Sequence, residues 1–190
     1  MNPLGRPRVD ASRVVIRRLR EDDVERFFEP AARDVARQWL AQQERAELHV
    51  AVAEVDGAPV GHGCLSFRYF ARHRVGYTFA VSVRAEWRSR GVGSLILLHL
   101  GRVARERGYR ALRCAIDKAN PRSRAWHERL RYRVIGEKIV RWTAPDGREV
   151  ALDSWILERP LVPLFRWRLR LERVLDALRG PAPPRTSPDD

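Results

Sequence analysis

One stretch decides the fold, Val81-Ser82-Val83-Arg84-Ala85-Glu86-Trp87-Arg88-Ser89-Arg90-Gly91-Val92-Gly93-Ser94. It predicts a strand that runs into a turn with two glycines and then into a helix, which the apolar spacing extends to about Arg107. Backbone N–H groups in such a turn and in the first helical turn can point at an anion. Gly91 and Gly93 let the chain approach a bulky phosphate, and Arg88 and Arg90 add charge that suits a pyrophosphate better than a single carboxylate.

The glycine spacing argues against two common nucleotide sites. A dinucleotide fingerprint needs Gly-x-Gly-x-x-Gly, and a P-loop needs Gly-Lys followed by Ser or Thr; the sequence contains neither. A nucleoside triphosphatase is therefore disfavoured. Taken alone, the stretch is also compatible with an ordinary helix start in an arginine-rich protein.

Outward from this stretch, apolar periodicity and turn residues predict the remaining elements. The expected strands lie near 14–19, 48–55, 59–70, 76–83, 112–116, 132–143 and 149–157, and the expected helices near 22–28, 31–46, 91–107 and 121–130. In the strand before the glycine turn, Tyr77, Phe79, Val81 and Val83 share one parity, which predicts that they face the same side. The order predicts an α+β fold: a mixed, mostly antiparallel sheet of six to seven strands flanked by helices, with at least one parallel crossover.

The sequence divides into one domain with appendages. Residues 1–12 are expected to be a flexible arm, 13–159 the folded domain, 160–179 a basic amphipathic helix and 180–190 a disordered tail rich in proline. Three interpretations of the terminal helix stay open. It can pack on its own sheet or across a homodimer, it can touch an anionic membrane surface, or it can touch nucleic acid. Packing against protein is favoured because a full apolar stripe usually finds a protein partner.

Composition narrows the class of protein. The 37 basic and 24 acidic residues leave a net charge of +13, and all basic residues except Lys118 and Lys138 are arginine. Such a charge attracts nucleic acid, acidic lipid or a phosphorylated cofactor, or it reflects a habit of composition. The apolar fraction of 44% excludes disorder throughout. Cys64 and Cys114 stand alone, so we expect no disulfide framework and a reducing, cytoplasmic location. His62 and His73 lack partners at metal-ligand spacing, so we expect no metal site.

At this point the sequence resembles a family, the GCN5-related N-acetyltransferases (GNAT). Arg88-x-x-Gly91-x-Gly93 is similar to the family's acetyl-coenzyme A motif, Arg/Gln-x-x-Gly-x-Gly/Ala. Further along, Asn120-x-x-Ser123 and Leu130-Arg131-Tyr132 stand where members often have Asn-x-x-Ser and Leu-Gly-Phe. The resemblance covers about residues 14–157 and implies the acyl-CoA N-acyltransferase fold. It also implies direct transfer of an acetyl group from acetyl-CoA to a primary amine, on a small molecule or a protein N-terminus.

The resemblance assigns roles to individual residues. The loop amides, with two arginine side chains, would cradle the pyrophosphate of coenzyme A: Arg88, Ser89, Arg90, Gly91, Val92, Gly93 and Ser94. The backbone of Val81, Ser82 and Val83 would pair with the pantetheine arm and polarise the thioester carbonyl, and Asn120 and Ser123 would contact its far side. The strands before the loop and near Leu112 would splay apart, making the gap where thioester and amine meet.

The resemblance leaves the catalytic acid and base open. Many members have a Tyr seven residues after the Asn, and here that position is His127. His127 could protonate the leaving thiolate as an imidazolium, or it could be a partly exposed helical residue with no role in catalysis. Six residues are conceivable bases, and none stands out: Glu29, Asp34, Glu54, His62, Asp117 and Asp153. A relay through water would leave no trace in the sequence.

The acceptor is equally open. Tyr69 and Phe70 are either core residues or part of the acceptor mouth, and an antibiotic or polyamine acceptor would require an acidic pocket that the sequence does not place. An alternative from another class is a non-catalytic module that senses acyl-CoA or holds nucleic acid. The expected partners are acetyl-CoA and an amine; a homodimer is conceivable, specific nucleic acid is not expected, and membrane contact is not favoured.

Overall fold

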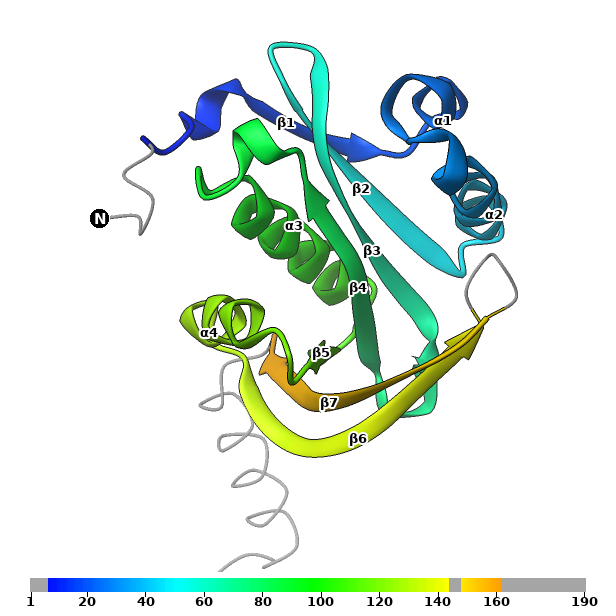
Figure 1. The fold of residues 1–190 in the computed structure, drawn as a ribbon, viewed down its shortest axis with the longest axis vertical. Coiled ribbons are helices and arrows are strands. Elements are labelled where there is room, and N and C mark those ends of the chain that lie inside the picture. The colour runs from blue at the N-terminus through cyan, green and yellow to red at the C-terminus, as the bar shows by residue number, and fades with distance from the viewer. Residues whose placement is uncertain (1–6, 144–147, 162–190) are drawn as a thin grey trace, which may run out of the picture.

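The structure is a computed structural model that describes residues 7–143 and 148–161. In this part of the chain a seven-stranded sheet has the order β1-β2-β3-β4-β5-β7-β6 (Figure 1). The strands are β1 (Val14–Arg18), β2 (Leu48–Val55), β3 (Ala58–Phe70), β4 (Val75–Val83), β5 (Ala111–Asp117), β6 (Arg133–Thr143) and β7 (Glu149–Pro160). The α-helices are α1 (Glu21–Phe27), α2 (Arg33–Glu44), α3 (Val92–Glu106) and α4 (Pro121–Arg129). The predicted α+β class, with its mixed and mostly antiparallel sheet, is confirmed.

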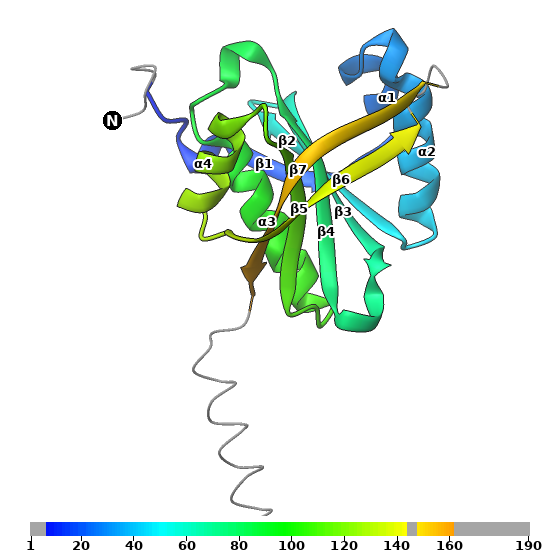
Figure 2. The ribbon, with the colours of Figure 1, turned by 60° about the horizontal axis from the view of Figure 1, so that its bottom comes forward.

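Helices cover both faces of the sheet. Figure 2 shows α3 and α4 on one side and α1 and α2 on the other. Each side has its own core: Leu65, Ile96, Leu100 and Leu112 belong to the cluster under α3, and Val50 to the cluster under α1 and α2. The strands therefore carry buried apolar residues on both faces, as the continuous burial of β2 reflects. No helix in the described residues has the length and apolarity needed to cross a membrane.

The sheet opens between β4 and β5, its one parallel pair. These strands pair only at Val75 with Ala111, Gly76 with Leu112 and Tyr77 with Arg113. Past this point β5 keeps its antiparallel partner β7 as far as Asp117, whereas β4 keeps only β3. A gap between the two strands follows, as the family resemblance implied.

A bulge in β4 overturns one sequence prediction. Cys64 pairs with Phe79, but the next pair along is His62 with Ser82, so β4 has one extra residue, and Ala80 has a positive φ of 50°. The extra residue reverses the alternation of side chains. Phe79 accordingly packs on the cluster under α1 and α2, whereas Val81 and Val83 pack on the cluster under α3. The prediction that Tyr77, Phe79, Val81 and Val83 face one side was wrong for this reason.

The N-terminal segment differs from the expected loose arm. The N–H of Val9 donates to the carbonyl oxygen of Arg90 at 2.9 Å, and Asp10 caps the short helix Ala11–Arg13. Val9 therefore contacts the domain, whereas the other residues of 7–12 are exposed. The predicted helix at 160–179, apart from its first two residues, and the predicted tail at 180–190 lie outside the described residues.

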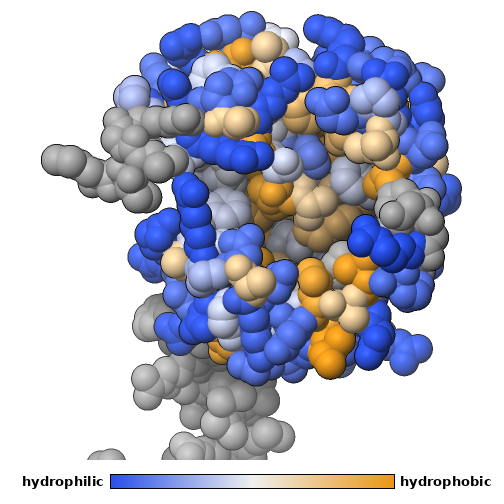
Figure 3. All heavy atoms as spheres, viewed as in Figure 1, coloured by the Kyte–Doolittle hydropathy of each residue, from blue (hydrophilic) through white to orange (hydrophobic). Residues whose placement is uncertain are grey.

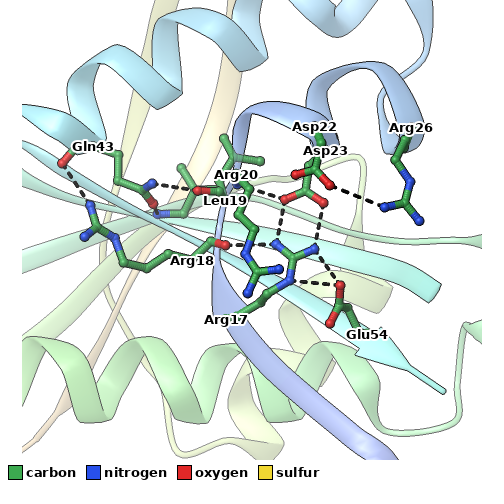
Figure 4. Close-up of polar contacts among 10 residues, drawn as sticks. Arg17, Arg18, Leu19, Arg20, Asp22, Asp23, Arg26, Gln43 and Glu54 are labelled. Carbon is green, nitrogen blue, oxygen red and sulfur yellow. Dashed lines mark hydrogen bonds and ion pairs between the residues drawn. The ribbon is translucent and has the colours of Figure 1, made fainter. Parts of the chain in front are cut away.

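A largely buried ion-pair network ties β1 to α1 and β2 (Figure 4). The guanidinium of Arg17 donates to both carboxylate oxygens of Asp23, at 2.6 and 2.7 Å, and to Oε1 of Glu54 at 2.5 Å. The side chains of Arg17 and Asp23 are 12% and 2% exposed. Burial alone would raise the pKa of Asp23, but hydrogen bonds from Arg17 and the Arg20 amide outweigh it and lower that pKa. Asp23 is therefore ionised in the fold.

Replacing Asp23 tests the network. Asp23→Asn leaves Arg17 buried beside only one carboxylate, and we expect the free energy of unfolding in urea to fall by about 3 kcal/mol. The matched control is Asp22→Asn, the same change one residue earlier in the same helical turn, because Asp22 pairs with Arg26 in an exposed bridge. That control should lose no more than about 1 kcal/mol. Equal losses for the two variants would contradict a special contribution from the buried network.

Two histidines stack between β2 and α3. Nε2 of His49 lies 3.2 Å from Nε2 of His99, and the ring planes differ by 28°. Burial, with the charges of His99, Arg18 and Arg107, lowers the pKa of His49 to about 4. The folded protein therefore holds His49 neutral at pH values where the unfolded chain already binds the proton.

The lowered pKa of His49 makes the stability of the fold depend on pH. Because the folded pKa of His49 lies below the unfolded value of about 6.5, its contribution to stability is lost as the pH falls from 6.5 toward 4. We expect His49→Gln to reduce the slope of unfolding free energy against pH in this window by up to about 1.4 kcal/mol per pH unit. Urea denaturation at pH 7, 6 and 5 measures it, with the exposed His73→Gln as the control. An unchanged slope in His49→Gln would refute the assignment.

Candidate functional site

The loop between β4 and α3 presents backbone N–H groups at the start of a helix. Gly91, with a φ of 97°, precedes α3, and its carbonyl oxygen accepts the N–H groups of Ser94 and Leu95 at 3.0 and 3.1 Å. Val92 and Gly93 occupy the first helical turn, where amides have no acceptor within the helix. A side chain at position 91 would be strained because of the positive φ. The loop is thus a concave set of donors at the positive end of a helix.

Three arginines bring positive charge to this loop. Arg88 donates from Nε to the carbonyl oxygen of Val83 at 2.9 Å, and the guanidinium of Arg90 lies 5.3 Å from the centre of the Trp87 ring. Nε of Arg90 is buried and makes no hydrogen bond within the described residues. Arg122, on α4, donates to the Ser89 hydroxyl at 3.1 Å. The unpaired Nε and the helix-start amides fit a pyrophosphate, which offers several acceptor oxygens.

Helix α4 is anchored beside the same loop. Nε1 of Trp126 donates to the Ser94 hydroxyl at 3.0 Å, and a Cβ added at Gly93 would lie 3.1 Å from Cζ2 of Trp126. Oδ1 of Asn120 accepts the N–H of Ser123 at 3.0 Å and caps α4. The structure therefore brings the loop and the Asn120 end of α4 to one place. Arg122 and Trp126 were missed by the sequence analysis, because their contacts to the loop span more than 30 residues.

The strand before the loop offers an unpaired edge. Ser82 and Val83 pair with His62 and Gly61 of β3, and no strand in the described residues pairs with Val81–Val83 on the side toward β5, although the Val83 carbonyl oxygen accepts Nε of Arg88. Gly61 is required here, since a Cβ would approach the carbonyl oxygen of Ser82 to 2.9 Å. Such an edge can take an extended chain as if it were a further strand.

His127 lies in the core below this gap. Its side chain belongs to a residue only 4% exposed, and its ring packs edge-on against Trp126 and Tyr132. Nδ1 donates to the carbonyl oxygen of Ser123 at 2.9 Å. Burial lowers the pKa of His127, although the hydrogen bond to Ser123 opposes the shift. The prediction that His127 is a partly exposed helical residue is therefore wrong. With its pKa lowered, His127 is largely neutral at pH 7.

Most conceivable bases are engaged in the structure. Glu54 binds Arg17, Asp34 pairs with Arg37, Asp117 accepts the N–H of Ala119, Asp153 pairs with Lys118, and Glu29 is exposed. His62 differs, because it lies opposite Ser82 and its ring is 5.0 to 5.7 Å from those of Phe27, Phe28 and Trp39. Burial lowers the pKa of His62 to about 4. Across the described ranges, no three His, Cys, Asp or Glu side chains gather as metal ligands would.

A cavity of about 420 Å³ lies on the α2 side of the sheet. Its lining residues are Gln42, Leu48, Ser66, Arg68, Tyr69 and Phe79. The face drawn in Figure 3 is hollowed, and apolar side chains gather in the hollow. The sequence analysis gave Tyr69 and Phe70 as either core residues or part of the acceptor mouth. Tyr69 is 70% exposed and lines the cavity. Phe70 packs against Tyr77 and Arg113.

Comparison with known proteins agrees with this geometry. The family model described as "Acetyltransferase (GNAT) family" matches residues 15–132. An N-acetyltransferase from Staphylococcus aureus Mu50 is 21% identical, with a TM-score of 0.63 over 78% of this chain and 99% of its own. The ribosomal-protein-alanine N-acetyltransferase from Brucella melitensis is 24% identical, with a TM-score of 0.60 over 77% and 99%.

A third solved structure was determined with acetyl-CoA. This protein, yncA from Salmonella typhimurium, is 18% identical, with a TM-score of 0.61 over 79% of this chain and 95% of its own. At these identities the three structures show a shared fold. No curated protein matches the chain in sequence.

Proposed function

We propose that the chain, which belongs to the GNAT family of acetyltransferases, transfers an acetyl group from acetyl-CoA directly onto a primary amine. The observation that carries the proposal is the loop from Arg88 to Ser94, which joins helix-start amides, a buried unpaired arginine nitrogen and a strand edge that runs into the gap. The acceptor can be a small molecule or a protein N-terminus.

The proposed cofactor-binding residues fall into three groups. The loop residues Ser89, Arg90, Gly91, Val92, Gly93 and Ser94, with Arg88, would hold the pyrophosphate, and Arg122 joins them on geometric grounds. The strand edge at Val81–Val83 would pair with the pantetheine arm, and Asn120 and Ser123 would contact its other side. The hydrogen bond from Trp126 to Ser94 joins α4 to α3 and so holds the first and third groups near each other.

The chemistry needs orientation more than a reactive side chain. The amine nitrogen forms a bond to the acetyl carbon, the carbon–sulfur bond breaks, and the proton that the nitrogen loses balances the leaving thiolate. A backbone N–H beside the gap can stabilise the oxyanion between these events. Holding the two reactants together supplies much of the rate.

A binding experiment tests the cofactor site. Gly91→Glu places a carboxylate and a strained φ at the anion cradle, and we expect isothermal titration to show at least a 30-fold weaker affinity for acetyl-CoA than in the parent. The matched control is Gly108→Glu, the same change at a glycine that also has a positive φ and an open Cβ position, at the other end of α3. The control should bind as the parent does.

Two outcomes would contradict the proposal. The first is a parent protein that binds no acetyl-CoA at hundreds of micromolar, and the second is Gly91→Glu binding as tightly as the control. Binding of acetyl-CoA without release of free thiol from any amine, together with salt-dependent retention of DNA, would instead favour the non-catalytic alternative.

The sequence left open whether His127 is the proton donor, and a substitution tests that role. Removing a general acid costs about 10²- to 10⁴-fold in rate. Because burial keeps His127 largely neutral, we expect His127→Gln to lower kcat for thiol release by less than tenfold at pH 7.5, with KM for acetyl-CoA unchanged. A loss of a hundredfold or more that is greatest below pH 7, where the imidazolium is populated, and shrinks as the pH rises would establish His127 as the acid.

A further inference from the structure

The α2-side cavity adjoins the gap between β4 and β5. Phe79 lines the cavity and is the last residue before the bulge at Ala80, and pairing between β4 and β5 has already ended at Tyr77. The loop from Arg88 to Ser94 leads into α3, which covers the opposite face of the sheet (Figure 2). A molecule in the cavity can therefore reach the gap from the face that the cofactor loop does not occupy.

Two aromatic side chains, Tyr69 and Phe79, belong to the cavity lining and continue into a row of rings beyond it. Tyr69 contacts Tyr77 edge-on at 5.3 Å between ring centres, and Tyr77 stacks with Phe79 at 6.1 Å. Phe79 contacts Trp39 at 6.1 Å, and Trp39 in turn contacts His62 at 5.7 Å. These contacts form an unbroken row of rings from the exposed Tyr69 to the residue that pairs with Ser82.

The charges around the cavity disfavour a second positive charge on the ligand. Arg68 is the charged residue among those that line it, and the nearest described carboxylate partner, Glu47, already binds Arg68 at 3.2 Å. Farther along the same face, Glu158 pairs with Arg113 at 2.5 Å. Among the lining residues that the structure describes, an additional ammonium group would find no carboxylate.

Aromatic side chains have two opposing effects on a charged amine, attraction to the ring face and loss of hydration, and these differ in free energy. A ring face attracts a cation by about 0.5–2 kcal/mol, whereas burial of an unpaired ion costs several kcal/mol. At the buried end of the row, beyond the cavity lining, the second effect prevails, since burial lowers the pKa of His62 to about 4. An amine in this row would likewise be shifted toward the neutral form, which is the nucleophile.

We infer that the acceptor is a monoamine carried on an aromatic or apolar body, and that this body occupies the cavity between Tyr69 and Phe79. The inference rests on the proposed acetyl transfer. A polyamine does not fit this surface, because its further ammonium groups would meet Arg68. The inference also accounts for the lack of a dedicated carboxylate base, since the cavity itself favours the uncharged amine.

The test measures release of free thiol from acetyl-CoA by the full-length protein with three acceptors: 2-phenylethylamine, spermidine and a peptide that begins with alanine. We expect kcat/KM to be at least tenfold higher for 2-phenylethylamine than for the other two. Tyr69→Ala should lower the ratio of phenylethylamine to spermidine at least fivefold, chiefly through KM. Arg68→Glu should raise kcat/KM for spermidine, because it adds a carboxylate to the lining.

The control is Leu98→Ala, which removes another exposed apolar side chain, 46% exposed, from α3 on the opposite face. It should leave all three acceptors unchanged. Equal or better use of spermidine or the peptide, or an unchanged ratio in Tyr69→Ala, overturns the inference while the acetyl transfer itself stands. Thiol release by none of the three acceptors also overturns it, and titration with acetyl-CoA then shows whether the proposed function fails as well.

Discussion

The arrangement depends on one feature of the sheet, the early end of pairing between β4 and β5. The antiparallel ladder with β7 persists along the whole of β5, and the parallel ladder with β4 ends at Tyr77 and Arg113. Backbone groups on β4 beyond that point face a gap, which is costly unless water or a ligand satisfies them. The loop to α3 and the start of α4 follow the ends of these two parallel strands, so both lie at the same edge of the sheet, where β4 and β5 have parted.

The two faces of the sheet are held by different means. The α3 side is a continuous apolar cluster, into which Trp126 and His127 bring α4. The α1 and α2 side has a smaller cluster, and there Arg17 joins β1, α1 and β2 through charged hydrogen bonds. The loop before α3 thus rests on an apolar base. The aromatic row lies under helices that polar contacts secure, and it is the more open of the two surfaces.

Local signals predicted the fold and the loop well. Glycine spacing, caps and alternation depend on neighbouring residues, so all seven strands and the four α-helices were foreseen, whereas the splay was implied by the family resemblance. The reversal at Ala80 was not, because a bulge is set by the partner strand and by Gly61, which lies under Ser82. The burial of His127 depends on Tyr132, and the contact of Arg122 with Ser89 on the packing of α4. The cavity joins residues as far apart as Gln42 and Phe79, which only the tertiary fold brings together.

The two cysteines have a practical consequence that follows from where β3 and β5 lie. Cys64 and Cys114 are both buried, and burial raises the pKa of each thiol, to about 12 for Cys114. The reactive thiolate is therefore scarce while the protein is folded, and oxidants and alkylating reagents find little to attack. Unfolding exposes both groups at once. Reaction of the chain with a thiol reagent thus reports the unfolded fraction, and the folded protein contributes almost no background where coenzyme A is the thiol being measured.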